Sequence, residues 1–143
     1  MKSRAHSTWH GDLFSGSGTT ALATRAAEPL PVSWPSRTEA AAGKTSPEEL
    51  IAAAHAACYN MALSNGLAQA GTPAERLDTD AEATFEKTDA GWRLTKMELT
   101  VHGAVPGIDA DAFQAAAAAA KDGCPVSNAL KGNVEITLSA TLG

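Results

Sequence analysis

Two cysteines and one histidine carry the side chains with most potential for chemistry. Cys58 lies in an alanine-rich segment, and His55 precedes it by three residues. The two side chains share a face if this segment is helical. A thiol beside an imidazole can act as a nucleophile, and the same pair can supply two metal ligands. A plainer alternative also stands, in which Cys58 is a small buried apolar side chain and His55 packs and hydrogen-bonds in a helix interface.

The second cysteine stands at the expected start of a short helix. Cys124 follows Gly123 and precedes Pro125, and backbone N–H groups at a helix start stabilise a thiolate. A second thiol makes a disulfide with Cys58 plausible, although the sequence does not show whether the two sulfurs meet. The chain has no CxxC motif, no HExxH motif and no third adjacent ligand, so a metal site is not favoured.

The segment around Cys58 carries strong helix signals. Ser46 is a good N-cap, Pro47 suits the first helical position, and Glu49 completes a capping box with Ser46. We therefore predict a helix over residues 50–70, ended by Gly71. Apolar residues nearly encircle its middle, so we expect a central helix that is buried on most sides.

The residues before this helix alternate loosely and contain several turn formers. We predict strands near residues 2–10 and 13–23, then an irregular stretch over 26–45 with a short strand near 32–34. The glycine-rich residues 16–19 match neither a P-loop nor a dinucleotide fingerprint, so a hairpin turn is expected there.

The residues after the helix predict strands, then helices, then a last strand. Residues 76–105 form two antiparallel strands around a turn at 89–91. The remaining elements are a helix from Asp109 or Asp111 to about Lys121, a short helix after Cys124, and a strand over 134–138. Strands at both ends with helices between them indicate an α+β fold.

Composition and charge exclude several classes of protein. The chain has 143 residues, which suits a single domain over 1–143, and a net charge of −5, which argues against nucleic acid and anionic membranes as partners. We expect no membrane span and no secretory signal, so the expected location is cytoplasmic. A core rich in alanine is thin, which favours further burial through oligomerisation.

Several motifs resemble one known family. The segment 46–58, Ser-Pro-Glu-Glu-Leu-Ile-Ala-Ala-Ala-His-Ala-Ala-Cys, resembles the cysteine-helix signature of the OsmC/Ohr hydroperoxide reductases. The segments 105–109 and 123–127 resemble the second signature of that family. Trp9-x-Gly11-Asp12 and the loop with Arg37 occur in the family's order. The amino-acid sequences of the motifs resemble the OsmC branch more than the Ohr branch.

The resemblance implies a thiol peroxidase for defence against oxidative or osmotic stress that needs no cofactor, metal or haem. Cys58 would be the peroxidatic cysteine, Cys124 would resolve it through a disulfide, and Arg37 with Glu48 would form the charged pair that activates Cys58. The substrates would be organic hydroperoxides and, more weakly, hydrogen peroxide, and a dithiol that is often lipoyl-linked would regenerate the enzyme. The fold would be an intertwined homodimer with antiparallel sheets around central helices.

Helix geometry adds a constraint to these implied roles. Burial disfavours the thiolate, so Cys58 needs a nearby cation such as Arg37. Glu48 and Cys58 are ten positions apart on one helix, which is about 15 Å along its axis. Two such helices, antiparallel and crossing near Ala53, would bring Glu48 of one to Cys58 of the other. We therefore expect composite sites across a dimer interface.

Two alternatives belong to other functional classes. A cysteine hydrolase would use Cys58 with His55 and would not need Cys124. A non-catalytic small-molecule binding module would need neither thiol. Activity measurements on cysteine variants would separate all three functions.

Overall fold

The computed structural model describes residues 1–39 and 43–143. These residues form two compact units, Met1–Leu50 and Ile51–Gly143. The structural neighbours reported below confirm the predicted α+β class. The single domain over 1–143 stays a prediction.

The first unit is built on a three-stranded antiparallel sheet in the order β1-β2-β3. Its strands are β1 (Ala5–His10), β2 (Ser17–Leu22) and β3 (Leu30–Val32). The predicted strand near 32–34 thus lies slightly earlier, and a single turn of helix, α1 (Pro35–Thr38), follows it. Pro35 stands in the first turn of α1, where its missing N–H costs no helical hydrogen bond. This helix falls in the stretch predicted to be irregular, of which residues 40–42 lie outside the described part of the chain.

The long helix α2 (Pro47–Gln69) confirms the predicted helix almost to its ends. The Ser46 hydroxyl accepts the backbone N–H of Glu49 at 3.1 Å, as the N-cap signal predicts. The second half of the predicted capping box differs, because the Glu49 carboxylate accepts the hydroxyl of Thr45 at 2.5 Å. The Glu49 carboxylate thus accepts a hydrogen bond from the Thr45 hydroxyl and not from the backbone N–H of Ser46, which the capping box predicts.

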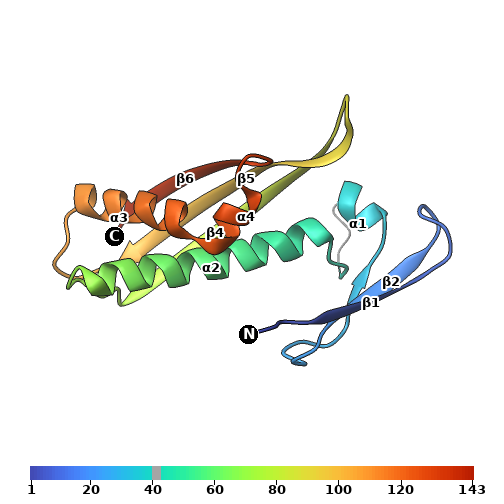
Figure 1. Ribbon diagram of the computed structural model, residues 1–143, viewed down its shortest axis with the longest axis horizontal. Helices are drawn as coiled ribbons and strands as arrows, with labels where there is room; N and C mark the ends of the chain where they lie inside the picture. The colour runs from blue at the N-terminus through green and yellow to red at the C-terminus, as the bar shows by residue number, and fades with distance from the viewer. Residues whose placement is uncertain (40–42) are drawn as a thin grey trace. The chain divides into compact units, whose positions relative to one another are not determined.

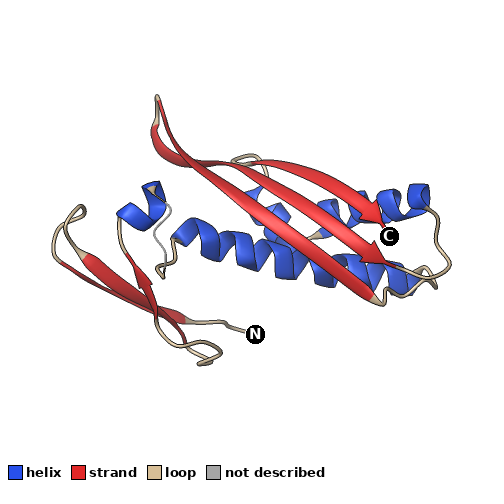
Figure 2. Ribbon diagram, turned by 180° about the vertical axis from the view of Figure 1, so that it is seen from behind, coloured by secondary structure: helices blue, strands red, loops and turns tan. Residues whose placement is uncertain are grey.

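The second unit is a three-stranded sheet with helices on one face. The sheet has the order β4-β5-β6, from β4 (Arg76–Thr88), β5 (Gly91–Ala104) and β6 (Glu135–Leu142). Figure 1 shows α2, α3 (Ala110–Gly123) and α4 (Pro125–Leu130) beside this sheet, and Figure 2 shows the sheet in front of them from behind. One pairing differs from the expectation of antiparallel sheets, because β6 runs parallel to β5. The chain crosses over through α3 and α4 before it enters β6.

The core of this unit lies between the sheet and the helices. The inward side chains of β5 alternate with polar outward ones such as Lys96 and Glu98, which form an ion pair at 2.8 Å. Gly103 leaves no room for a side chain unless its neighbours shift, because a Cβ there would stand 2.5 Å from the Phe113 ring of α3. The core residues come from α2, β5, the following loop, α3 and the start of α4: Tyr59, Leu63, Leu67, Leu99, Val101, Val105, Phe113, Ala117, Ala120 and Cys124.

The burial of α2 corrects one expectation. Its buried residues recur at helical spacing along one face: Ala52, His55, Tyr59, Leu63 and Leu67. The predicted burial on most sides is wrong for a single chain, because Ala53, Ala54 and Ala57 are exposed and Met61 is 67% exposed. An apolar stripe of α2 is therefore left without cover.

Candidate active site

The first pair of predicted site residues joins α1 to the start of α2. Nη2 of Arg37 donates to Oε1 of Glu48 at 2.5 Å, and Nε of Arg37 lies 3.2 Å from both carboxylate oxygens. The guanidinium also lies 5.6 Å from the ring centroid of Trp34, which favours a cation over its face. Glu48 is buried, with 7% of its surface exposed. A planar fork held by a buried carboxylate presents its remaining donors in a fixed direction.

The second pair is made of the two thiols. Cys58 lies in the middle of α2 and is partly exposed, whereas Cys124 is buried and begins α4. Both are free thiols, and their side chains lie within hydrogen-bonding contact of each other. The sequence left open whether these sulfurs meet, and the structure brings them together.

The surroundings of Cys58 oppose its ionisation. Burial raises the pKa of the Cys58 thiol, and the neighbouring Cys124 raises it further. The backbone N–H of Val126 acts in the opposite direction but does not outweigh these effects. Within its own unit, Cys58 therefore lacks the stabilisation that a reactive thiolate requires.

The surroundings of Cys124 favour its ionisation. Burial opposes the thiolate, but hydrogen bonds from the backbone N–H groups of Ser127 and Val126, the Ser127 hydroxyl and the Cys58 thiol together lower the pKa of Cys124. Cys124 is the N-cap of α4, whose first N–H groups have no partner within the helix. The direction of this pKa agrees with the expected benefit of a helix start.

His55 joins α2 to α4 beside the thiols. Its Nε2 lies 2.7 Å from the hydroxyl oxygen of Ser127, and both side chains are buried. Burial lowers the pKa of His55, so the neutral imidazole is favoured. Its Nδ1 contacts no hydrogen-bond partner among the described residues. The sequence-based expectation that His55 packs and hydrogen-bonds in a helix interface agrees with this contact, although the sequence did not name Ser127 as the partner.

A groove of about 730 Å³ opens onto Cys58. Small and apolar residues form most of its wall, including Ala62, Gly66, Ala116 and Ala120, and Met61 lies at its side. Cys124 does not line it. A ligand in this groove would therefore meet Cys58 first.

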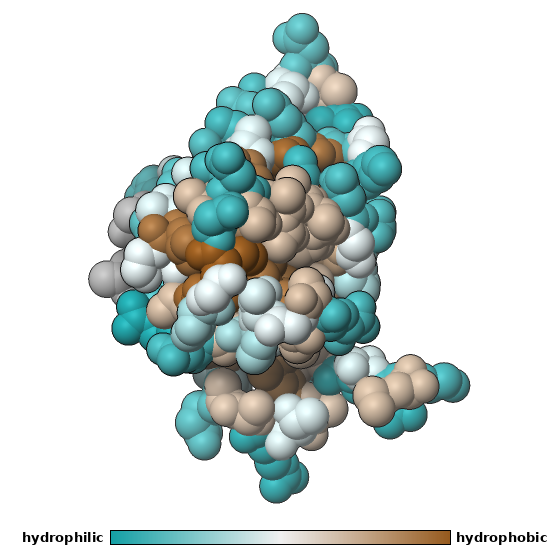
Figure 3. All heavy atoms as spheres, turned by 90° about the vertical axis from the view of Figure 1, so that its left-hand side faces the viewer, coloured by the Kyte–Doolittle hydropathy of each residue, from teal (hydrophilic) through white to brown (hydrophobic). Residues whose placement is uncertain are grey.

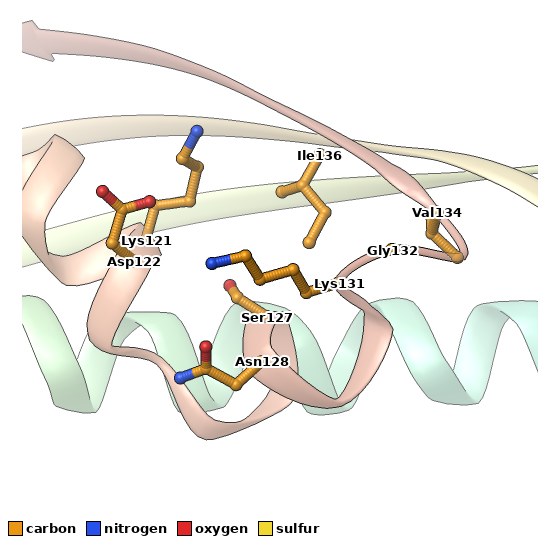
Figure 4. Close-up of a pocket in the computed structure, with 8 residues that line it drawn as sticks. All are labelled: Lys121, Asp122, Ser127, Asn128, Lys131, Gly132, Val134 and Ile136. Carbon is orange, nitrogen blue, oxygen red and sulfur yellow. The ribbon is translucent and has the colours of Figure 1, made fainter.

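A second pocket, of about 200 Å³, lies on another side of α4. Figure 4 shows Lys121, Lys131 and Asn128 around it, with Ser127 among the lining residues. Ser127 thus lies between this polar pocket and Cys124. No three His, Cys, Asp or Glu side chains cluster as metal ligands in residues 1–39 and 43–143. No helix in that part of the chain is long and apolar enough to cross a bilayer.

The four predicted site residues fall into two pairs, Arg37–Glu48 in one unit and Cys58–Cys124 in the other. Sequence reasoning missed Ser127 as a partner of Cys124 and of His55. A signal was present, because Ser127 is the third residue after an N-cap, a position whose N–H faces the capping side chain.

Comparisons with known proteins agree on one family. Residues 40–139 match the family described as OsmC-like protein. Peroxiredoxin OsmC of Escherichia coli (strain K12) is 45% identical over 141 residues, which is 99% of this chain and 95% of that protein. Organic hydroperoxide resistance protein OhrA of Bacillus subtilis (strain 168) is 34% identical over 100 residues, 66% of this chain and 65% of that protein. The crystal structure of organic hydroperoxide resistance protein OhrB of Bacillus subtilis superposes with a TM-score of 0.77 at 24% identity, covering 96% of this chain and 98% of that one.

Proposed function

This chain belongs to the OsmC family and is a thiol-dependent peroxidase, and from that premise we propose that Cys58 reduces organic hydroperoxides and that Cys124 resolves it. The single observation that carries the assignment of roles is the contact between an accessible thiol and a buried one. Peroxide can reach Cys58 through the groove, whereas Cys124 is placed to attack whatever forms on Cys58.

The proposed cycle has three steps. The Cys58 thiolate attacks the peroxide, so that an S–O bond forms and the O–O bond breaks, and the leaving alkoxide takes up the proton that the Cys58 thiol released and departs as an alcohol. The Cys124 thiolate then attacks the sulfur of the Cys58 sulfenic acid, which forms the disulfide and releases the hydroxyl group as water. A dithiol reductant, for which a lipoyl group is the proposed carrier, restores both thiols by exchange.

The activating cation in this proposal comes from a partner subunit. Glu48 and Cys58 lie on one continuous helix and are separated by about 15 Å along its axis. The exposed small side chains of α2, Ala53, Ala54 and Ala57, support close packing of two such helices. In a homodimer whose α2 helices cross at these residues, the Arg37–Glu48 pair of one subunit would meet Cys58 of the other. We also propose that residues 1–143 form a single domain.

Exposed apolar surface also supports a dimer. Figure 3 shows hydrophobic atoms exposed among hydrophilic ones in the upper half of that view. In the first unit Phe14 is 71% exposed and Leu13 is 49% exposed, on a hairpin next to Trp9. Large apolar side chains exposed in this number are typical of an interface.

The groove at Cys58 supports an organic substrate. Its walls are mostly alanine and glycine, so they offer room and few polar partners for the substituent of a hydroperoxide. Hydrogen peroxide would gain nothing from these walls, which favours the organic substrate. Two free thiols that must return to the reduced state suit a reducing compartment, so we place the protein in the cytoplasm.

The test of this function compares peroxide consumption by wild type, Cys58→Ser and Cys124→Ser. We expect Cys124→Ser to consume about one equivalent of an organic hydroperoxide and then stop as a sulfenic acid, which dimedone labelling detects by mass spectrometry. Wild type should show a Cys58–Cys124 disulfide after the same treatment. Absence of that disulfide would refute the two-cysteine cycle, and full turnover by Cys124→Ser would do the same.

A further inference from the structure

The hydrogen bond between His55 and Ser127 has a direction that the burial of the ring determines. A neutral imidazole carries one N–H, on either Nδ1 or Nε2. On Nδ1 this N–H would be a buried donor with no partner among the described residues, whereas on Nε2 it donates to the Ser127 oxygen at 2.7 Å. Buried N–H groups without a partner are rare. We therefore place the proton of His55 on Nε2.

This direction frees the Ser127 hydroxyl proton. When Ser127 Oγ accepts from His55, its own O–H can donate elsewhere, and the sulfur of Cys124 is the group it faces. The resulting chain runs from His55 Nε2–H to Ser127 Oγ and from Ser127 O–H to Cys124 Sγ. Each donor in this chain stabilises negative charge on the sulfur.

We propose that Ser127, oriented by His55, holds the Cys124 sulfur as a thiolate for its attack on oxidised Cys58, so that both are positioning residues for the resolving step. The proposal rests on the two-cysteine cycle proposed above. In this step the Cys124 thiolate forms the S–S bond, the S–O bond of the Cys58 sulfenic acid breaks, and the hydroxide takes up the proton that Cys124 released. Neither Ser127 nor His55 changes its own number of protons.

The same contacts assign the leaving group when the disulfide is reduced. Cys58 is partly exposed and Cys124 is buried, so an incoming dithiol thiolate attacks the Cys58 sulfur. The bond to Cys124 then breaks, and the electron pair leaves on the sulfur that Ser127 stabilises. A better leaving thiolate is released faster. The Ser127 hydroxyl would thus stabilise the Cys124 thiolate both in the resolving step and during reduction of the disulfide.

In any pH experiment, the titration of neighbouring groups must be distinguished from the effect of the His55–Ser127–Cys124 hydrogen bonds. The titratable groups that face Cys124 are Cys58 and Tyr59, both on α2. Ser127 also lines the polar pocket of Figure 4, whose charged members are Lys121, Asp122 and Lys131. Tyr59 and the three charged pocket residues are unchanged in all variants below, and residue 58 is the same in all proteins of each experiment, so these groups contribute equally within each comparison.

A single-turnover experiment tests the proposal on the full-length protein. Reduced enzyme is mixed with one equivalent of cumene hydroperoxide and quenched over time, and sulfenic acid and disulfide are quantified by mass spectrometry. We expect Ser127→Ala to form the Cys58 sulfenic acid at the wild-type rate and to convert it to disulfide about tenfold more slowly at pH 7. Raising the pH should restore most of the conversion rate, which a merely structural loss would not do.

Titration of Cys124 provides the second measurement. In a Cys58→Ser background, thiolate absorbance near 240 nm reports Cys124, and Ser127→Ala should raise its midpoint by about one pH unit. His55→Leu should shift the midpoint in the same direction. His55→Gln should stay close to wild type, because the glutamine amide can still donate to Ser127 without titrating.

Matched controls separate the proposal from effects on folding. Thr79→Val removes the hydroxyl that donates to Asn60 of α2 at 2.6 Å, away from the thiols, and should resolve as wild type does. If Ser127→Ala is unstable, the double variant with His55→Leu removes both polar partners and leaves neither group unpaired. Wild-type resolution and titration in Ser127→Ala, or in that double variant, would overturn the proposal. Failure to form any sulfenic acid on Cys58 would instead refute the proposed function.

Discussion

The middle of α2 and the start of α4 each present one thiol, and the two regions have opposite effects on its exposure and on its pKa. The middle of α2 exposes Cys58 to a groove but raises the pKa of its thiol by burial. The start of α4 buries Cys124 but supplies hydrogen bonds that lower the pKa of its thiol. Access to substrate and readiness to ionise are therefore separated between the two sulfurs. A peroxidase with this arrangement needs a cation from elsewhere for the accessible thiol.

Removal of the accessible thiol should have the largest effect. Cys58→Ser differs little in volume, so we expect the fold to survive while turnover of an organic hydroperoxide falls to background, because a serine hydroxyl does not ionise at neutral pH. Peroxide consumption checks this, with circular dichroism as the control for folding. Substantial remaining turnover would mean that the acidic thiol, Cys124, is the attacking one, and the comparison of the two regions would reverse.

Removal of the cation should have the next largest effect. Arg37→Ala should raise the pKa of the Cys58 thiol by about 1–3 pH units and lower the peroxidase rate at pH 7 about tenfold or more. Arg37→Lys should recover little, because a point charge does not keep the forked contact with Glu48. The measurement is the pH dependence of Cys58 alkylation in a Cys124→Ser background. Identical titration curves for wild type and Arg37→Ala would contradict the role of Arg37.

A change in the core should disturb α3, which leads to Cys124 and also lines the groove at Cys58. Gly103→Ala would place a methyl group 2.5 Å from the Phe113 ring, so α3 must shift from the sheet. We expect a loss of about 1–3 kcal/mol in the free energy of unfolding, measured by urea denaturation. Gly66→Ala is the matched control, because a Cβ there meets nothing within 4 Å. Equal stability of the two variants would show that the Phe113 contact is not tight.

Replacement of His55, which joins the two regions, by glutamine should have the smallest effect, a change in stability confined to acid. Burial lowers the pKa of His55 in the folded protein, so below about pH 6.5 the unfolded chain binds more protons at this residue. Its contribution to stability is complete above that pH and is lost as the pH falls through the folded pKa. His55→Gln should therefore lose less stability than wild type between pH 6.5 and 5, measured by thermal unfolding. Parallel losses in the two proteins would show that the ring titrates normally.

Local signals predicted most elements of this fold. Ser46 caps α2 as its side chain and position indicate, and Asp109 caps α3 by accepting the N–H of Ala112 at 2.8 Å. Such signals succeed because a cap acts within one turn of helix. The parallel pairing of β6 with β5 was not predictable in this way, since it depends on where the chain returns after α3 and α4.

The sequence supplied the candidate site residues but not their contacts. The family motifs identified Cys58 and Cys124, yet their contact joins segments that are distant in the sequence. The pair of His55 and Ser127 was not found, because each residue alone is unremarkable and only the packing of α4 on α2 brings them to 2.7 Å. The burial pattern of α2 was also misjudged, since alanine is compatible with either a core or an interface.

The contact between the two thiols in the reduced protein has a consequence for survival at high peroxide doses. A newly formed sulfenic acid has two fates, which are capture by a neighbouring thiol and further oxidation by a second peroxide molecule. In the proposed cycle Cys124 captures it from within hydrogen-bonding contact of Cys58, and a reaction between groups held together proceeds as if its partner were extremely concentrated. Dissolved peroxide at cellular concentrations competes poorly with such a neighbour. The packing of α4 against α2 would thus limit irreversible over-oxidation of Cys58 at high peroxide doses.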